Sequence, residues 1–178
     1  MIRRIDHIAI VVEDIEEALT FWQESLGLEV SHVEEVPDQE SIVAFLPAGE
    51  SEIELVEPTT GNSGVARYLA KRGPGMHHLC LEVESLEPVL ARLKDRGVRL
   101  INEEPIIGTG GKKIAFIHPK SAFGVLVELY ELTPEEPQRR LEAMRRLRRR
   151  LAVNSLAARE GIFTFLRTLR SRAPRRAN

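Results

Sequence analysis

The sequence predicts an α+β protein made of two consecutive βαβββ modules, followed by a helical C-terminal extension. Three observations support this fold class. The expected order strand-helix-strand-strand-strand occurs twice along the chain. Residues 7–19 align with residues 78–90 at an offset of 71, and residues 53–57 align with residues 127–131 at an offset of 74. Self-similarity over such distances indicates a duplicated structural unit.

The first module is expected over about residues 3–58. Residues 4–12 are mostly β-branched and apolar, which is typical of a strand. Apolar residues then recur at helical spacing and predict a helix that ends at Gly27, a natural stop. The remaining strands are expected at residues 28–34, 41–47 and 52–57, with proline-containing turns between them.

The second module is expected over about residues 76–132. A short linking helix over residues 63–72 precedes it, and the Gly73-Pro74-Gly75 break separates the two. The module itself is predicted to contain a strand, a helix and three further strands, at residues 76–83, 86–97, 98–101, 113–118 and 124–131.

Charge is distributed unevenly along the 178 residues, although the net charge is only −2. Residues 1–133 contain 12 Lys and Arg against 23 Asp and Glu, so their net charge is −11. Residues 134–178 contain 13 Arg, 4 Glu and no Lys, so their net charge is +9. We therefore divide the chain into an acidic domain, residues 1–133, and a basic tail, residues 134–178.

Several classes of protein are excluded by simple features of the sequence. No apolar run approaches the ~20 residues that a membrane-spanning helix needs. The first residues lead into a stretch with acidic side chains, unlike a signal-peptide core. Cys80 is the single cysteine and cannot form an internal disulfide, which fits a cytoplasmic protein. The sequence contains no P-loop and no paired-cysteine zinc motif.

Each module begins its first strand with a histidine and carries a glutamate in its last strand. These residues are His7 and Glu54 in the first module, and His78 and Glu128 in the second. Taken singly, each has an ordinary interpretation as a hydrogen-bonded structural histidine or a glutamate on a solvated strand face. The repeat makes the pairs equivalent, so a pseudo-twofold axis would bring all four together. Two imidazoles and two carboxylates suit Co²⁺, Mn²⁺, Ni²⁺, Fe²⁺ or Zn²⁺.

His77 competes with His78 for this role. The repeat aligns His7 with His78 and Asp6 with His77, which favours His78. Neighbouring strand residues point to opposite faces, so we do not expect both histidines to bind one ion. Cys80 lies on the same face as His78, and we expect it to be a small, buried thiol that packs in the core.

Several stretches of the chain resemble the methylmalonyl-CoA epimerase family of the vicinal-oxygen-chelate superfamily. The resemblance covers about residues 3–132. Its motifs are Asp6–Val11, Gly75–Val83, Glu104–Gly111, Phe116–Ser121 and Gly124–Leu129. The ending that begins at His118 is the most family-specific part, whereas the opening Asp6-His7-Ile8 is shared more widely.

The resemblance implies a paired-module fold with one divalent metal ion, held by His7, Glu54, His78 and Glu128. It further implies an acyl-CoA substrate, and epimerisation of methylmalonyl-CoA by 1,1-proton transfer through a metal-stabilised enolate. Glu128 is the expected base and Glu54 its partner on the other face of the carbon. Some epimerases have Gln in place of Glu54, and some carry a further Glu, proposed as a second acid/base, where this chain has Val43. A homodimer is expected.

Two other functions remain open at this point. Glu54 makes the four ligands identical in type to those of nickel-type glyoxalase I, which acts on the hemithioacetal of glutathione and methylglyoxal. A non-catalytic small-molecule binding protein of the same fold is the alternative outside the enzymes. The flanking motifs, rather than the ligands, favour the epimerase family.

The basic tail is predicted to form amphipathic helices. A first apolar stripe runs through Leu141, Met144, Leu147 and Leu151, and Gly161 is expected to interrupt the helix before a second stripe through Ile162, Phe165, Leu166 and Leu169. Three roles remain open for residues 134–178. They are docking on the acidic domain or on a second subunit, binding of nucleic acid or anionic lipid, and disorder.

Overall fold

The computed structural model describes residues 1–108, 112–131 and 155–172. The first module comprises β1 (Ile2–Val11), α1 (Ile15–Leu19), β2 (His32–Val36), β3 (Ser41–Ala48) and β4 (Ser51–Pro58). Helix α2 (Gly64–Arg72) leads to the second module, which comprises β5 (Gly75–Val83), α3 (Leu86–Asp95), β6 (Ile106–Ile107), β7 (Lys113–Ile117) and β8 (Leu126–Glu131). Helix α5 (Ser155–Arg172) belongs to the basic tail.

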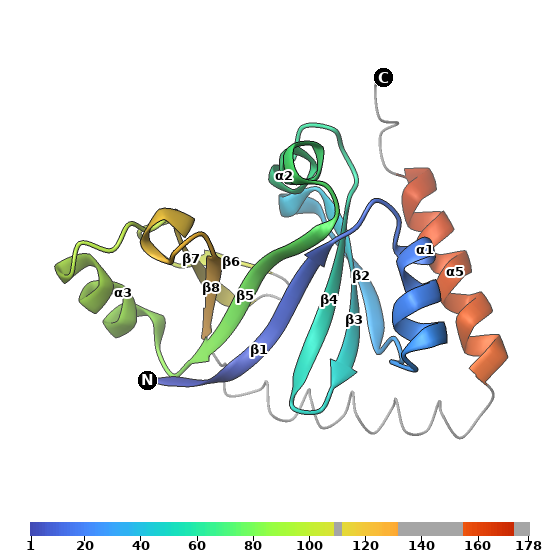
Figure 1. Cartoon of the computed structure of the whole chain (residues 1–178), viewed down its shortest axis with the longest axis horizontal. Helices are drawn as coiled ribbons and strands as arrows, with labels where there is room; N and C mark the ends of the chain where they lie inside the picture. Colours follow the sequence, from blue (N-terminus) through green and yellow to red (C-terminus); the bar gives the residue numbers. More distant parts are fainter. Residues whose placement is uncertain (109–111, 132–154, 173–178) are drawn as a thin grey trace.

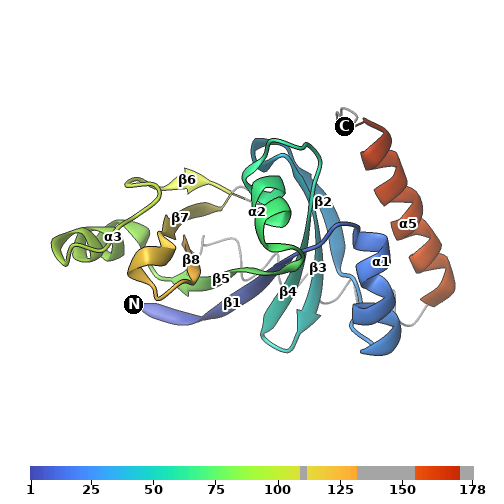
Figure 2. The same cartoon turned by 45° about the horizontal axis from the view of Figure 1, so that its top comes forward.

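One curled, mixed sheet of eight strands joins the modules, in the order β2-β3-β4-β1-β5-β8-β7-β6 (Figures 1 and 2). Strands β1 and β5 are antiparallel and lie at its centre. Each of them pairs in parallel with the last strand of its own module, β1 with β4 and β5 with β8. The two halves of the sheet are therefore related by a pseudo-twofold axis between β1 and β5, as the repeat predicts.

The register of the central strands shows this symmetry residue by residue. His7 lies opposite Cys80, and Ala9 lies opposite His78. Ala9 also pairs with Glu54 on β4, and Cys80 pairs with Glu128 on β8. Opposite residues point to the same face of a sheet. The fold therefore places the predicted histidines and glutamates on one face, around the axis.

Two apolar clusters cover the faces of the first module. On one face α1 packs against Ile42, Ala44 and Leu55 of the sheet. On the other face, α2 packs through Val65 against a cluster that includes Val43. In the second module, α3 packs on a smaller cluster of β7 and β8 side chains. This packing fixes the strands that carry the polar site residues.

Two expectations about the elements were wrong in detail. Residues 98–101 form no strand, because Leu100 makes one isolated bridge to Ile117 and the side chain of Asn102 then takes the hydrogen bond from the Phe116 amide. The short strand β6 lies further along the chain instead. The strand expected over residues 28–34 begins only at His32. The first helix ends just before Gly27, as expected, because a π-helical turn over Thr20–Ser25 continues α1.

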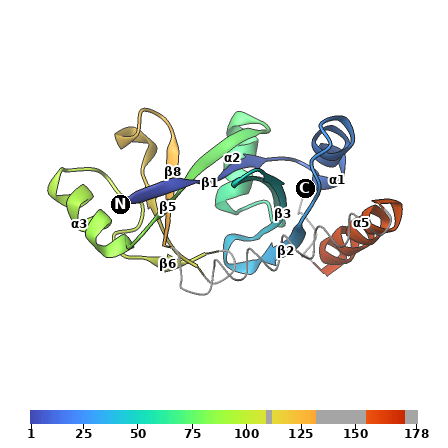
Figure 3. The ribbon, with the colours of Figure 1, turned by 90° about the horizontal axis from the view of Figure 1, so that it is seen from below.

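Helix α5 lies along the first module beside α1 and β2 (Figures 1 and 3). Leu166 and Leu169 are buried in the cluster that contains Ile15. Gly161 lies inside this helix and does not interrupt it. Glycine in a helix costs about 1 kcal/mol, which burial of the two leucines offsets. The first expected stripe, at residues 141–151, lies outside the described residues.

Within the described ranges, no helix is long and apolar enough to span a membrane.

Candidate metal centre

His7 and His78 meet at the pseudo-twofold axis. His7 comes from β1 and His78 from β5, and their Nε2 atoms are 3.1 Å apart. Both side chains are buried. Because the antiparallel register offsets each histidine from the axis by the same amount, the two rings approach from opposite sides and direct the same ring nitrogen toward one point.

Glu54 and Glu128 reach the same point from the adjacent strands. The Glu128 Oε2 atom is 2.9 Å from His78 Nε2 and 4.0 Å from His7 Nε2. The Glu54 Oε2 atom is 3.6 Å from His7 Nε2 and 3.8 Å from His78 Nε2. Both carboxylates are buried. The structure thus brings together all four residues that the repeat singles out.

Burial and the neighbouring charges shift the pKa values of this cluster. Burial alone would lower the pKa of His7, but the charge of Glu54, the hydrogen bond to Asp6 and the charge of Glu128 raise it to about 9. Burial would raise the pKa of Glu128, but the hydrogen bond from His78 and the charges of both histidines hold it below its usual value. The pocket therefore favours positive charge between two carboxylates.

The donor set fits a divalent ion of intermediate softness. Ligand atoms of His7, Glu54 and His78 lie within 4.8 Å of one another, and Glu128 adds a carboxylate oxygen next to His78. Buried carboxylates are costly unless they are paired or bind a cation. Imidazole nitrogens and carboxylate oxygens are common ligands of zinc, cobalt, nickel, iron and manganese.

Asp6 supports His7 from behind, a role that the sequence interpretation missed. The His7 Nδ1 atom lies 3.1 Å from Asp6 Oδ2. Asp6 is held in turn by Arg4, whose Nη2 atom is 2.8 Å from Asp6 Oδ1 and whose Nε atom is 2.8 Å from Glu82 Oε2. Burial would raise the pKa of Asp6, but its contacts with His7 and the charge of Lys112 lower it. The feature of the sequence that could have indicated this role is the adjacency of Asp6 and His7.

His77 does not follow simple strand alternation. Ala9 pairs with His78 and Ile10 with Met76, so His77 is the extra residue of a β-bulge. The bulge turns its ring toward His78, and the two Nδ1 atoms are 3.0 Å apart. The expectation that these histidines point to opposite faces was therefore wrong. Burial and the charge of His78 lower the pKa of His77 to about 4.

Cys80 lies beside the cluster as a buried, free thiol. Its sulfur, with ligand atoms of Asp6 and His7, forms a second group of potential donors within 4.8 Å. Burial and the charge of Glu128 raise the pKa of Cys80 well above its usual value. A thiol that stays protonated is a poor metal ligand, so the packing role predicted for Cys80 agrees with its surroundings.

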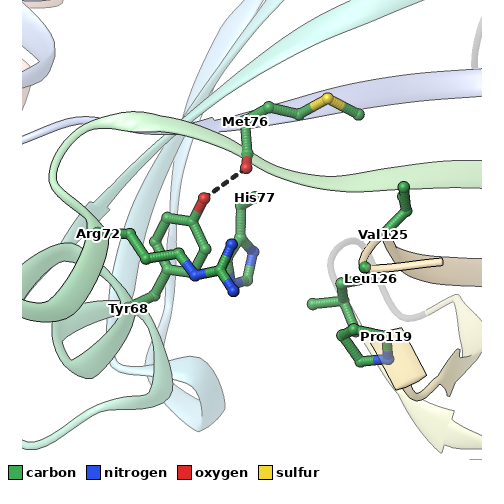
Figure 4. A pocket seen from close by; sticks show the side chains of 8 residues that line it. Tyr68, Arg72, Met76, His77, Pro119, Val125 and Leu126 are labelled. Atoms are coloured by element: carbon green, nitrogen blue, oxygen red, sulfur yellow. Dashed lines mark hydrogen bonds between the residues drawn. The ribbon is translucent and has the colours of Figure 1, made fainter. Parts of the chain in front are cut away.

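A pocket of about 210 Å³ opens next to His77, between α2 and the second module (Figure 4). Its walls combine aromatic, apolar and basic side chains, among them Tyr68, Arg72, Pro119, Val125 and Leu126. The Tyr68 hydroxyl donates a 2.6 Å hydrogen bond to the Met76 carbonyl, which holds the α2 wall against β5. The site therefore has an adjacent cavity that could admit part of an organic ligand.

The fold and these four converging side chains define a class of protein. A family model for the glyoxalase/bleomycin resistance protein/dioxygenase superfamily matches residues 6–116, and the chain belongs to that superfamily. Within it, the chain is similar to methylmalonyl-CoA epimerases. The ethylmalonyl-CoA/methylmalonyl-CoA epimerase of Cereibacter sphaeroides is 40% identical over 134 residues, which is 74% of this chain and 100% of that protein.

Two further relatives match this chain over a similar length. The uncharacterized protein YqjC of Bacillus subtilis is 45% identical over 128 residues, covering 72% of this chain and 91% of that protein. A solved methylmalonyl-CoA epimerase in complex with methylmalonyl-CoA and NH4+ is 36% identical, with a TM-score of 0.71. That comparison covers 75% of this chain and 97% of the other.

Proposed function

We propose that this protein is a metal-dependent methylmalonyl-CoA epimerase. The observation that carries the proposal is the convergence of His7, Glu54, His78 and Glu128 in a buried site of a chain that is 40% identical to a known epimerase. These four residues would hold one divalent ion. The proposed substrate is an acyl-CoA, as the names of the related epimerases indicate.

Epimerisation requires removal of the C2 proton and return of a proton to the opposite face of that carbon. Proton removal places negative charge on the thioester oxygen, and a bound divalent ion supplies Lewis-acid stabilisation of that charge. General acid–base catalysis needs one group on each side of the carbon. Two carboxylates related by the pseudo-twofold axis provide such a pair.

Glu128 is assigned as the base that removes the proton, and Glu54 as the acid on the other face. The lowered pKa of Glu128 keeps its carboxyl ionised at neutral pH, as a base must be. The bonds that hold Glu128 also orient it, because its Oε2 atom contacts His78 Nε2. Glu54 approaches from β4, on the opposite side of the central strand pair.

The pocket beside His77 is the proposed entrance for the thioester arm. Its apolar walls suit an extended organic chain, and Arg72 offers a positive charge at the pocket for an anionic group. These features suit an acyl-CoA better than a small, uncharged ligand.

Solvent deuterium incorporation at C2 of methylmalonyl-CoA tests the proposal. Wild type is expected to label both stereoisomers. Glu128→Gln is expected to lower labelling of the stereoisomer whose proton it removes by about 10²–10⁴-fold. A parallel assay with methylglyoxal and glutathione should show no comparable turnover. Undiminished labelling by the variant would remove Glu128 from its role, and preferential turnover of the hemithioacetal would favour glyoxalase chemistry.

A further inference from the structure

The two halves of the site support their histidines in matching ways with different groups. In the first module, Asp6 Oδ2 contacts His7 Nδ1 at 3.1 Å. In the second module, His77 Nδ1 contacts His78 Nδ1 at 3.0 Å. The repeat aligns Asp6 with His77 and His7 with His78. Each converging histidine thus has its preceding residue against its far ring nitrogen.

The β-bulge makes the second of these contacts possible. In a regular strand, His77 and His78 would point to opposite faces. The extra residue between the Ile10–Met76 and Ala9–His78 pairs rotates the His77 ring to the side of His78. Tyr68 of α2 then packs against the His77 ring at an interplanar angle of 88° and a centroid separation of 4.8 Å. The ring is therefore held on both sides.

Hydrogen-bond chemistry restricts the tautomers of this pair. A 3.0 Å contact between two Nδ1 atoms can contain only one proton, since two N–H groups would repel and two lone pairs would form no bond. If His78 binds an ion through Nε2, its proton must be on Nδ1. His77 must then accept through Nδ1 and carry its own proton on Nε2.

We propose that His77 is a positioning residue that accepts the Nδ1–H of His78 and so directs the Nε2 lone pair of His78 to the ion. The inference rests on the proposed metal-dependent function. Metal-binding histidines commonly donate their other N–H to a carboxylate, a carbonyl or a water. Asp6 provides such a carboxylate for His7, whereas a neutral imidazole takes this place for His78.

Metal affinity of three variants tests the inference. His77→Phe keeps an aromatic ring but removes the acceptor, and it should weaken Zn²⁺ and Co²⁺ binding by about 10–100-fold. His77→Asn places a carbonyl oxygen where Nδ1 lies and should recover most of that loss. His32→Phe makes the same exchange at an exposed histidine of β2, outside the cluster, and should leave the affinity unchanged. Dissociation constants are measured by competition with a chromophoric chelator.

A purely structural role for His77 gives a different pattern. It would lower the thermal stability of the metal-free His77→Phe and His77→Asn proteins together, without rescue of binding by Asn. Affinity of His77→Phe equal to that of wild type would overturn the inference. Failure of wild type itself to bind a divalent ion would instead contradict the proposed function, and the inference with it.

Nitrogen NMR of the zinc-loaded wild type supplies a test that needs no variant. We expect His77 Nε2 and His78 Nδ1 to carry protons, and His77 Nδ1 to show the shift of an unprotonated, hydrogen-bonded nitrogen. A proton found on His77 Nδ1 would overturn the inference, because His77 could then not accept from His78.

Discussion

At the scale of single residues, the proposed metal binding depends on the protonation state of His7. Its pKa of about 9 means that the metal-free protein carries an imidazolium at pH 7. The neighbouring carboxylates stabilise that proton in the position where an ion would otherwise supply positive charge. A proton and the proposed metal ion would therefore compete for the same cluster.

Metal uptake at pH 7 is expected to release about one proton from His7, since only neutral imidazole binds a metal. The raised pKa sets the direction: affinity should rise by about tenfold per pH unit up to pH 9 and then level off with respect to this group. Calorimetric titration of Zn²⁺ in buffers of different ionisation enthalpy measures the proton count. Uptake without proton release at pH 7 would contradict the protonated state of His7.

Glu54→Gln separates ligation from proton transfer. The amide oxygen can still bind an ion, so the variant is expected to retain stoichiometric metal. Epimerisation should fall by about 10²–10⁴-fold, because one of the two proposed acid/base groups is missing. Deuterium labelling should persist for the stereoisomer that Glu128 serves and fail for the other. Epimerisation at the wild-type rate would show that another group returns the proton.

The candidate site was predictable from the sequence to the extent that the repeat encodes it. His7 and His78, and likewise Glu54 and Glu128, are found by alignment of the two halves. The contact of His77 was not predictable, because a β-bulge depends on the cross-strand register with β1. Strand periodicity alone places that side chain on the wrong face.

At the scale of elements, the sequence predicted most strands but not their limits. Apolar, β-branched runs marked β1, β3, β4, β5, β7 and β8. The remaining strands and the strand limits depend on which segments pair with one another. Leu100 makes a single bridge to Ile117, flanked by backbone hydrogen bonds from Ile101 N to Phe116 O and from His118 N to Arg99 O. The ladder goes no further, because the amide of Phe116 donates to the side chain of Asn102 instead. Competition of this kind has no local sequence signal.

Helix α5 is expected to stabilise the first module through Leu166, which is fully buried against α1 and the sheet. Leu166→Ala should lower the free energy of unfolding by about 2–5 kcal/mol, because it removes buried methyl groups and leaves a cavity. Thr164→Ala, at an exposed position of the same helix, serves as the matched control and should change little. Urea denaturation measures both; equal stability of the two variants would exclude docking of α5 in solution.

At the scale of the whole molecule, the charge difference between the domain and the tail has a partial structural explanation. Arg167 Nε lies 3.4 Å from Glu16 Oε1, so a basic residue of α5 meets an acidic residue of α1. Exposed pairs of this kind contribute little to stability. Burial of Leu166 and Leu169 therefore dominates the contact. The expected homodimer remains a prediction that sedimentation analysis can check.

The duplicated architecture links all three scales. Two modules meet at β1 and β5, their antiparallel register brings His7 and His78 together, and the adjacent parallel strands add one carboxylate from each side. In the proposed reaction, this symmetry would place one carboxylate on each face of the reacting carbon. The two halves are not identical, because Asp6 contacts the Nδ1 atom of His7 whereas His77 contacts that of His78. The two histidines can therefore differ in their properties as ligands.

The most direct test of the central claim is solvent deuterium incorporation at C2 of methylmalonyl-CoA by the wild-type protein, before and after removal of divalent ions with a chelator. The proposed metal-dependent function predicts that incorporation is lost on chelation and returns when one equivalent of Co²⁺ is added. Incorporation at the full rate by thoroughly metal-free protein would contradict it.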